Sequence, residues 1–224
     1  MSQDNRYQGV LFDLDGTLLD TANDLGAALN HVLEYHDMAQ VPEQDFRPVA
    51  SDGAKGLLEL GFDNALTGLD YEQLRQQFLR YYRENIACHT CFYQGIAPLL
   101  IALNERKIPW GVVTNKPIDL TLKLLPHYPL FAHCAVTVGG DSLAQRKPHP
   151  APLLYASEQL GLDPRQCVYV GDALRDIQAG NDANMATIVA KWGYIADTGV
   201  CRSWQADFLA DKPADILEFV LQSS

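Results

Sequence analysis

Positive charge is scarce in this chain, and long apolar runs are missing. Its 224 residues include 17 lysines and arginines against 28 aspartates and glutamates, so the formal net charge is −11. A surface this rich in acid repels nucleic acids and anionic lipid headgroups, and we therefore expect neither nucleic acid nor a membrane as a partner. No stretch approaches the ~20 consecutive apolar residues that a membrane-spanning helix needs. The composition, 47% hydrophobic and 20% charged, is typical of a globular protein.

The chain also lacks an even set of cysteines and an apolar leader. Five cysteines cannot all pair with one another, and residues 1–8 are polar where a secretory signal would be hydrophobic. We therefore expect free thiols and a cytoplasmic protein. Cys88 and Cys91 have the spacing of a redox or zinc motif, but no second cysteine pair accompanies them. Ordinary packed thiols are the favoured interpretation over a metal site there.

Apolar runs alternate with helical patterns from about residue 92 onward. Strands are expected at 108–113, 135–138, 167–170 and 187–190, with helices at 97–106, 151–160 and 176–183. Strands separated by helices of this length form βαβ units, which build a parallel sheet covered on both faces. We predict an α/β fold with a doubly wound, Rossmann-like parallel sheet.

Residues 21–91 lack this alternation. Apolar residues recur there at helical spacing, first around Leu25 and Leu29 and again around Leu74 and Phe78, and no apolar strand ends in an acid. We interpret this region as a helical insertion after the first strand. The predicted organisation is a catalytic core of residues 1–20 and 92–224, with a helical cap of residues 21–91.

The most informative motif is an apolar strand near residues 10–12 that ends in two aspartates. Asp13 and Asp15 follow the strand, and Gly16 allows the backbone to turn sharply. Neighbouring carboxylates repel each other, so a cation is expected to hold them. Mg²⁺ prefers oxygen ligands and suits phosphate chemistry. Solvated acids in an Asx-turn are one alternative, and an EF-hand is disfavoured because Leu18 stands where its loop needs glycine.

Polar residues also follow the other expected strands. They are Thr114, Asn115, Asp141, Lys147, Asp172 and Asp176. Parallel sheets place ligands at the carboxyl ends of their strands, so we expect these side chains to gather near the two N-terminal aspartates. A nucleophile, further acids, a hydroxyl and a cation are what phosphoryl transfer requires. Each residue alone has an ordinary alternative as a helix cap or a solvated charge, and the order of the whole set makes it specific.

These motifs resemble the haloacid dehalogenase superfamily, in the branch whose helical cap follows the first strand. Residues 13–17 match its first motif, Thr114-Asn115 its second, 147–150 its third and 171–176 its fourth. The resemblance extends from about Gln8 to Leu221. Within the superfamily the chain resembles phosphoglycolate phosphatases. Its segments 110–117, 171–176 and 192–195 look most like N-acetylmuramic acid 6-phosphate phosphatases.

The resemblance implies a Mg²⁺-dependent phosphatase. Asp13 would attack phosphorus and form an aspartyl-phosphate, and Asp15 would protonate the leaving alkoxide and then activate water. Mg²⁺ would be held by the Asp13 carboxylate, the backbone carbonyl of Asp15 and the Asp172 carboxylate, with Asp176 supporting these ligands from behind.

The resemblance also implies how the phosphoryl group is bound. Thr114, the amide of Asn115 and Lys147 would bind its oxygens, since a dianionic phosphate would otherwise be repelled by the acids. The partner would be a small phosphorylated metabolite. Nothing in the sequence specifies an oligomeric state.

Asp15 narrows the choice among the activities of the superfamily. The true dehalogenases lack an aspartate at this position because a departing halide needs no proton, so dehalogenation is disfavoured. Phosphonate cleavage would need a lysine in the cap to form a Schiff base, and Lys55 is the only lysine within residues 21–91. A sugar phosphomutase of the same fold, and a catalytically silent module that binds a phosphate or a protein, are further alternatives.

Substrate choice is expected to lie in the cap, because the core motifs meet only phosphate and metal. The segment 46–56 offers three donors to a leaving group: Arg47, Ser51 and Lys55. An ordinary connection between helices is the alternative interpretation of this segment. The core motifs resemble both phosphatase subfamilies, and Asp52 disfavours a small carboxylated substrate. We therefore expect 2-phosphoglycolate and N-acetylmuramic acid 6-phosphate about equally as the substrate.

Overall fold

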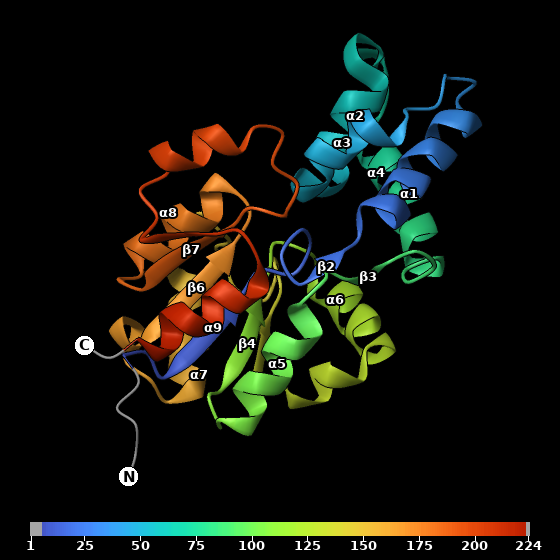
Figure 1. The fold of residues 1–224 in the computed structure, drawn as a ribbon. Helices are drawn as coiled ribbons and strands as arrows, with labels where there is room; N and C mark the ends of the chain where they lie inside the picture. Colours follow the sequence, from blue (N-terminus) through green and yellow to red (C-terminus); the bar gives the residue numbers. More distant parts are fainter. Residues whose placement is uncertain (1–5, 223–224) are drawn as a thin grey trace.

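The computed structural model describes residues 6–222, and its main feature is a six-stranded sheet. Every neighbouring pair of strands in it is parallel, in the order β5-β4-β1-β6-β7-β8. The strands are β1 (Gly9–Phe12), β4 (Trp110–Val113), β5 (Val136–Val138), β6 (Cys167–Gly171), β7 (Ala186–Ala190) and β8 (Phe208–Ala210). The predicted doubly wound parallel sheet is confirmed (Figure 1).

Helices cover both faces of this sheet. They are α5 (Ile96–Glu105), α6 (Ile118–Leu124), α7 (Ala151–Leu160), α8 (Leu174–Asp182) and α9 (Pro213–Leu221). Successive residues of β1 point to opposite faces: Val10 and Phe12 join the apolar cluster that contains residues of α5 and α9, whereas Leu11 joins the cluster of α7 and α8. Both clusters are buried, so β1 has no solvated face. This explains why its sequence is a continuous apolar run.

The four strands and three helices expected after residue 92 are all present, with bounds that differ from the prediction by at most two residues. The pattern did not predict α6, β8 or α9. The strand β8 has only three residues and pairs with β7 alone at the edge of the sheet, which is too short for an apolar run to stand out.

Four further helices lie between β1 and α5 in the chain, on one side of the sheet's carboxyl edge (Figure 1). They are α1 (Ala22–Tyr35), α2 (Glu43–Phe46), α3 (Gly53–Phe62) and α4 (Tyr71–Glu84), with the 3₁₀ segment Arg47–Asp52 between α2 and α3. Buried apolar residues such as Leu29, Phe62 and Phe78 hold them together. We keep the name cap for residues 21–91.

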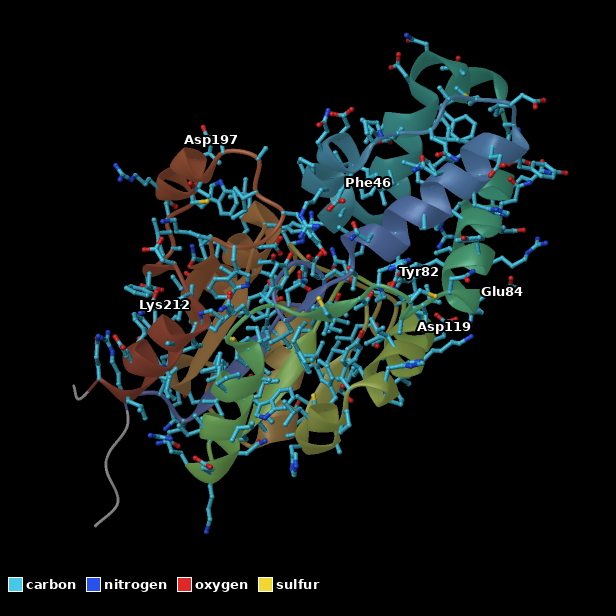
Figure 2. All side chains as sticks on the ribbon, turned by 45° about the vertical axis from the view of Figure 1, so that its right-hand side comes forward. Phe46, Tyr82, Glu84, Asp119, Asp197 and Lys212 are labelled. Carbon is cyan, nitrogen blue, oxygen red and sulfur yellow. The ribbon has the colours of Figure 1, made fainter. Side chains whose placement is uncertain are left out.

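The cap is joined to the core by two short antiparallel strands, β2 (Leu19–Asp20) and β3 (Cys91–Phe92). The predicted limits of the cap fall at these strands, and the division into two domains stays a prediction. Further contact comes from an ion pair between Arg83 of α4 and Asp119 of α6, where the ends of these helices approach each other (Figure 2). No helix within residues 6–222 has both the length and the apolar character needed to cross a membrane.

Candidate active site

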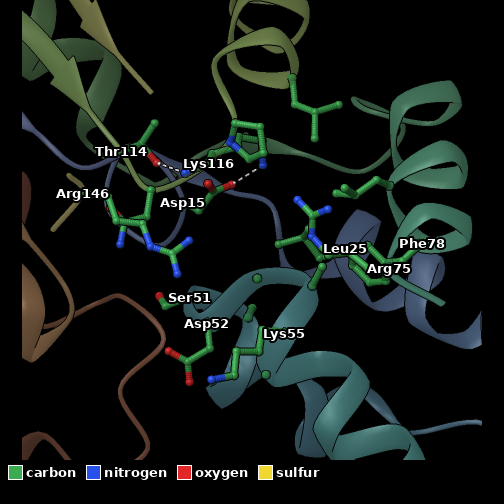
Figure 3. Close-up of a pocket in the computed structure, with 18 of the residues that line it drawn as sticks. Asp15, Leu25, Ser51, Asp52, Lys55, Arg75, Phe78, Thr114, Lys116 and Arg146 are labelled. Carbon is green, nitrogen blue, oxygen red and sulfur yellow. Dashed lines mark hydrogen bonds and ion pairs between the residues drawn. The ribbon is translucent and has the colours of Figure 1, made fainter. Parts of the chain in front are cut away.

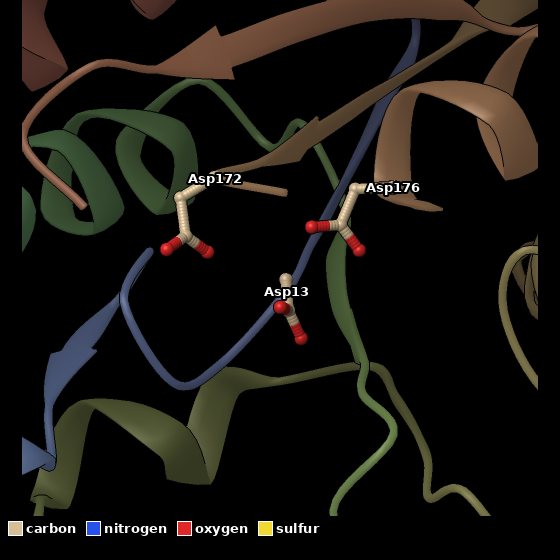
Figure 4. Close-up of side chains that lie close together, drawn as sticks. All are labelled: Asp13, Asp172 and Asp176. Carbon is tan, nitrogen blue, oxygen red and sulfur yellow. The ribbon is translucent and has the colours of Figure 1, made fainter. Parts of the chain in front are cut away.

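Three buried carboxylates lie together at the carboxyl edge of the sheet. Asp13 follows β1 and Asp172 follows β6, and these two strands are paired, so their ends meet. Asp176 comes from the first turn of α8. One oxygen from each of the three carboxylates lies within 4.8 Å of the others (Figure 4). Asp13, Asp172 and Asp176 thus lie together at the strand ends, as the sequence predicted.

Gly16 allows the backbone to come close to this cluster. Its φ is 85°, which side chains rarely adopt, and an added Cβ would meet the Asp172 carboxylate and the Tyr194 ring. The turn after Asp15 therefore passes directly beside Asp172. Any larger residue at position 16 would displace it.

Lys147 is the cation that faces these acids. Its Nζ lies 3.0 Å from Asp13 Oδ1 and 2.7 Å from Asp176 Oδ1, and its side chain is 1% exposed. It also donates hydrogen bonds to the Val113 carbonyl at 2.9 Å and to Tyr169 Oη at 2.6 Å. Burial opposes its charge, but the charges of Asp13 and Asp176 raise the pKa of Lys147 above its usual value. The lysine is therefore held protonated.

One lysine does not neutralise three carboxylates. Burial, together with the neighbouring acids, raises the pKa of Asp13 to about 6 and that of Asp172 to about 7. Asp13 Oδ1 is buried and accepts no hydrogen bond of good geometry from the residues described. Three clustered carboxylates that a single lysine does not neutralise are the kind of donor set that a hard divalent cation prefers, so these residues fit Mg²⁺.

Asp15 lies apart from the three clustered carboxylates. Its Oδ1 accepts hydrogen bonds from Thr21 Oγ1 at 2.6 Å and from Lys116 Nζ at 2.9 Å. Thr21 immediately precedes α1 of the cap, so this acid touches both parts of the molecule. The Asp15 side chain also lines the large cavity described below (Figure 3).

Thr114 and Asn115 follow β4 and line the same cavity. Thr114 Oγ1 accepts a hydrogen bond from the Lys116 amide at 3.1 Å, and Asn115 Nδ2 donates to the Lys147 carbonyl at 2.9 Å. Neither side chain caps α6. That role belongs to Asp141, whose Oδ1 accepts from the Ile118 amide at 2.7 Å, and Asp141 is not among the described residues that line the cavity.

A cavity of about 780 Å³ separates the core from the cap. Its core side carries Asp13, Asp15 and Lys147. Its cap side carries polar and apolar residues of the 3₁₀ segment, α3 and α4, among them Ser51, Lys55, Arg75 and Phe78 (Figure 3). The phosphate-binding candidates and Asp13 thus line the core side of a cavity whose opposite side is formed by the cap.

The three predicted specificity residues differ in position. Ser51 lines the cavity, and its Oγ donates to Asp172 Oδ2 at 3.0 Å. Lys55 also lines it, with a side chain 71% exposed and 3.8 Å from Glu59. Arg47 is not among the described residues that line the cavity.

The guanidinium of Arg47 is engaged elsewhere. It pairs with Asp20 and with Glu43, and it lies 5.6 Å from the centre of the Tyr194 ring. It therefore joins the cap to the connecting strands and is not one of the described residues at the cavity. A role of Arg47 in substrate specificity stays a prediction, and the position of Arg47 outside the cavity lining does not support it.

Among the described residues, four cations that line the cavity were not predicted as site residues: Arg75, Lys116, Arg146 and Arg175. Lys116 directly follows Thr114 and Asn115, and Arg175 lies between Asp172 and Asp176, so both stand inside motifs that were recognised. Arg175 donates to Asp52 Oδ1 at 2.8 Å and to the Ser51 carbonyl, which links the fourth motif to the cap. The position of Lys116 and Arg175 next to motif residues was the available signal.

The segment with two cysteines lies outside this site. All five cysteines are free, and Cys88 and Cys91 are exposed. Among residues 6–222, the group of side chains arranged as a metal site is the trio of aspartates.

The family model described as haloacid dehalogenase-like hydrolase matches residues 10–190. A phosphoglycolate phosphatase of Xanthomonas campestris pv. campestris is 40% identical over 211 residues, covering 94% of this chain and 95% of the relative. An N-acetylmuramic acid 6-phosphate phosphatase of Pseudomonas aeruginosa is 38% identical over 213 residues, covering 95% and 94%.

A solved structure agrees over nearly the whole chain. The crystal structure of a predicted phosphoglycolate phosphatase from Haemophilus somnus has a TM-score of 0.86 and 30% sequence identity, and covers 96% of this chain and 98% of its own. The likeness therefore includes the cap as well as the sheet.

Proposed function

The chain belongs to the haloacid dehalogenase-like hydrolases, and we propose on this basis that it is a Mg²⁺-dependent phosphatase of small phosphorylated metabolites. The observation that carries the proposal is the buried acid cluster with Lys147, of which Asp13 and Lys147 line the cavity between core and cap. A phosphoryl group needs positive charge around its oxygens and a nucleophile in line with the bond that breaks, and this cluster supports both.

In the proposed first step, a carboxylate oxygen of Asp13 attacks phosphorus. A bond forms between that oxygen and phosphorus while the bond to the leaving oxygen breaks, and Asp15 gives its proton to the departing alkoxide. In the second step Asp15 takes a proton from water, whose oxygen attacks phosphorus. Inorganic phosphate then leaves, and Asp13 returns to its free carboxylate.

The remaining residues bind and orient the phosphoryl group in this proposal. Lys147 would neutralise one of its oxygens, and Thr114 with the Asn115 amide would hold others. Mg²⁺, held by Asp13, Asp172 and the carbonyl of Asp15, would supply the further positive charge that the phosphate needs. Asp176 keeps Lys147 in place through the 2.7 Å ion pair.

The relatives carry two substrate names, and both remain proposals for this chain. 2-Phosphoglycolate would need a cation for its carboxylate, whereas an amino-sugar phosphate would need room for a ring. The cavity volume of about 780 Å³ supports the larger substrate, and the arginines at its border, Arg75 and Arg146, support an anionic one. Five free cysteines support the cytoplasm as the proposed compartment.

A panel of phosphorylated metabolites tests the proposal. We expect release of inorganic phosphate from one or more of them in Mg²⁺, with the highest kcat/KM for 2-phosphoglycolate or N-acetylmuramic acid 6-phosphate. Excess chelator should abolish turnover, and Mg²⁺ should restore it better than Ca²⁺, whose larger radius suits a looser geometry. Full turnover in chelator, or no turnover of any phosphate monoester, would contradict the proposal.

A further inference from the structure

Lys116 is a buried cation that the proposed mechanism leaves without a role. Its side chain is 5% exposed, and its Nζ lies 2.9 Å from Asp15 Oδ1. Burying an ammonium group is costly unless its charge is compensated, so a lysine is retained here only with a partner. The partner is the acid assigned to proton transfer, and not the three clustered carboxylates.

The cap covers this lysine from the other side. Lys116 Nζ lies 4.4 Å from the centre of the Tyr82 ring, which comes from α4. Tyr82 is 1% exposed and faces the core (Figure 2), and its hydroxyl has no hydrogen-bond partner among the residues described. A cation over an aromatic face is attracted to it, so the ring keeps water away while leaving the ammonium directed toward Asp15.

Both contacts of the Asp15 carboxylate fall on the same oxygen. Lys116 Nζ and Thr21 Oγ1 each donate to Oδ1, and no hydrogen bond or ion pair within residues 6–222 involves Oδ2. A carboxyl group that transfers a proton needs one oxygen available to the leaving group. Because the two oxygens move together, holding Oδ1 also determines where Oδ2 points.

We propose that Lys116 is a positioning residue for Asp15. It holds Oδ1 on the side where Thr21 and Tyr82 of the cap lie. This directs Oδ2 toward the cavity, where the oxygen of the leaving group would lie. The inference rests on the proposed function, since Lys116 acts only through the acid that protonates the leaving group. A lysine that bound the substrate phosphate directly would serve all phosphate esters alike.

The test compares two leaving groups. An alkyl phosphate releases an alkoxide that needs a proton, whereas p-nitrophenyl phosphate releases a stable phenolate that does not. Single-turnover rapid-quench measurements in Mg²⁺ isolate release of the leaving group from the later hydrolysis. For Lys116→Met, we expect about a 100-fold slower release from the alkyl ester and about a threefold slower release from the aryl ester.

Three further variants complete the design. Lys123→Met makes the same substitution on an exposed face of α6 and should leave both rates unchanged. Lys116→Arg keeps a donor and should restore alkyl release to within about tenfold of the wild type. Thr21→Val removes the other contact to Oδ1 and should also slow alkyl release more than aryl release, by a smaller factor than Lys116→Met. This variant keeps the test valid if Lys116→Met fails to fold.

The outcomes are distinct. Equal losses on both esters would overturn the positioning role and indicate phosphate binding or a purely structural role. Unchanged alkyl release in both Lys116→Met and Thr21→Val would also overturn it. If the wild type releases neither leaving group, the proposed function itself fails, and this is seen before any variant is measured.

Discussion

The two sides of the cavity hold their charges in different ways. On the core side, the side chains of Asp13, Lys147 and Asp176 are 6%, 1% and 0% exposed and lie in contacts of 3.0 and 2.7 Å. On the cap side, Lys55 and Glu59 are 71% and 53% exposed and lie 3.8 Å apart. Exposed pairs of this kind contribute little to stability, whereas a buried charge that loses its partner is strongly destabilising.

The difference corresponds to what each side meets. Every phosphate monoester presents the same phosphoryl group to the core, so a rigid arrangement held by buried ion pairs serves them all. The leaving group varies from one substrate to another, and exposed side chains on helices can adjust to it or be exchanged without loss of the fold. We therefore expect changes on the core side to affect chemistry and stability, and changes on the cap side to affect selectivity.

The largest expected effect is at the proposed nucleophile. Asp13→Asn removes the carboxylate proposed to attack phosphorus with almost no change in volume, so the protein should fold while kcat drops by about three orders of magnitude or more. Steady-state turnover measures the fall in kcat, and far-ultraviolet circular dichroism checks that the protein is folded. Asp182→Asn, on the exposed end of α8, is the matched control and should keep wild-type turnover. Near-normal turnover of Asp13→Asn would show that the core does not work through this residue.

A pair of lysine variants compares the two sides directly in stability. Lys147→Met leaves Asp13 and Asp176 buried without their cation, and should lower the free energy of unfolding by about 3–5 kcal/mol. Lys55→Met removes an exposed charge and should change it by less than about 0.5 kcal/mol. Urea unfolding of both variants in Mg²⁺ measures this. Similar values for the two would remove the distinction between a rigid core side and an adaptable cap side.

The acid cluster should also make the effect of Mg²⁺ on stability depend on pH. The pKa values of Asp13 and Asp172 are raised from 3.8 to about 6 and about 7, chiefly by burial. Between pH 4 and 7 the folded state then binds more protons than the unfolded state, so this contribution to stability is present at low pH and is lost as pH rises. Mg²⁺ requires the ionised carboxylates and should offset the loss.

Thermal unfolding with chelator and with Mg²⁺ at pH 5, 6, 7 and 8 checks this. The increase in Tm caused by Mg²⁺ should grow with pH, and Asp172→Asn should flatten that dependence. An increase of the same size at pH 5 and pH 8 would contradict the expected titration, because protons and the cation would then not compete.

The smallest expected effect compares two arginines of the cap. Arg75 lines the cavity, whereas Arg47 pairs with Asp20 outside it. Arg75→Ala should lower kcat/KM for the best metabolite by about tenfold, the value of one polar contact, and change p-nitrophenyl phosphate much less. Arg47→Ala should affect both substrates to a similar, smaller extent. The opposite pattern would show that Arg47 meets the substrate and would restore the specificity role predicted from the sequence.

The core could be predicted well because its signals are local. Each motif residue stands directly after an apolar strand, and parallel pairing brings the strand ends to one edge, so Asp13, Thr114 and Asp172 had to approach one another once the sheet was recognised. The strand β8 was missed because three residues at the edge of the sheet carry a weak pattern. Asp141 followed a strand as well, yet its side chain caps α6, which no spacing in the sequence distinguishes.

The sequence alone determined the α/β fold, the family and the acids that gather at the strand ends, because alternation of strands and helices is encoded in neighbouring residues. Only the tertiary structure decided what each cap residue faces. Arg47 was predicted to meet the substrate and Arg75 was not singled out, but the packing of α4 and the connecting strands places Arg75 at the cavity and directs Arg47 toward Asp20. The same packing places Tyr82 over Lys116, a contact between residues 34 positions apart that depends on how the cap lies on the core.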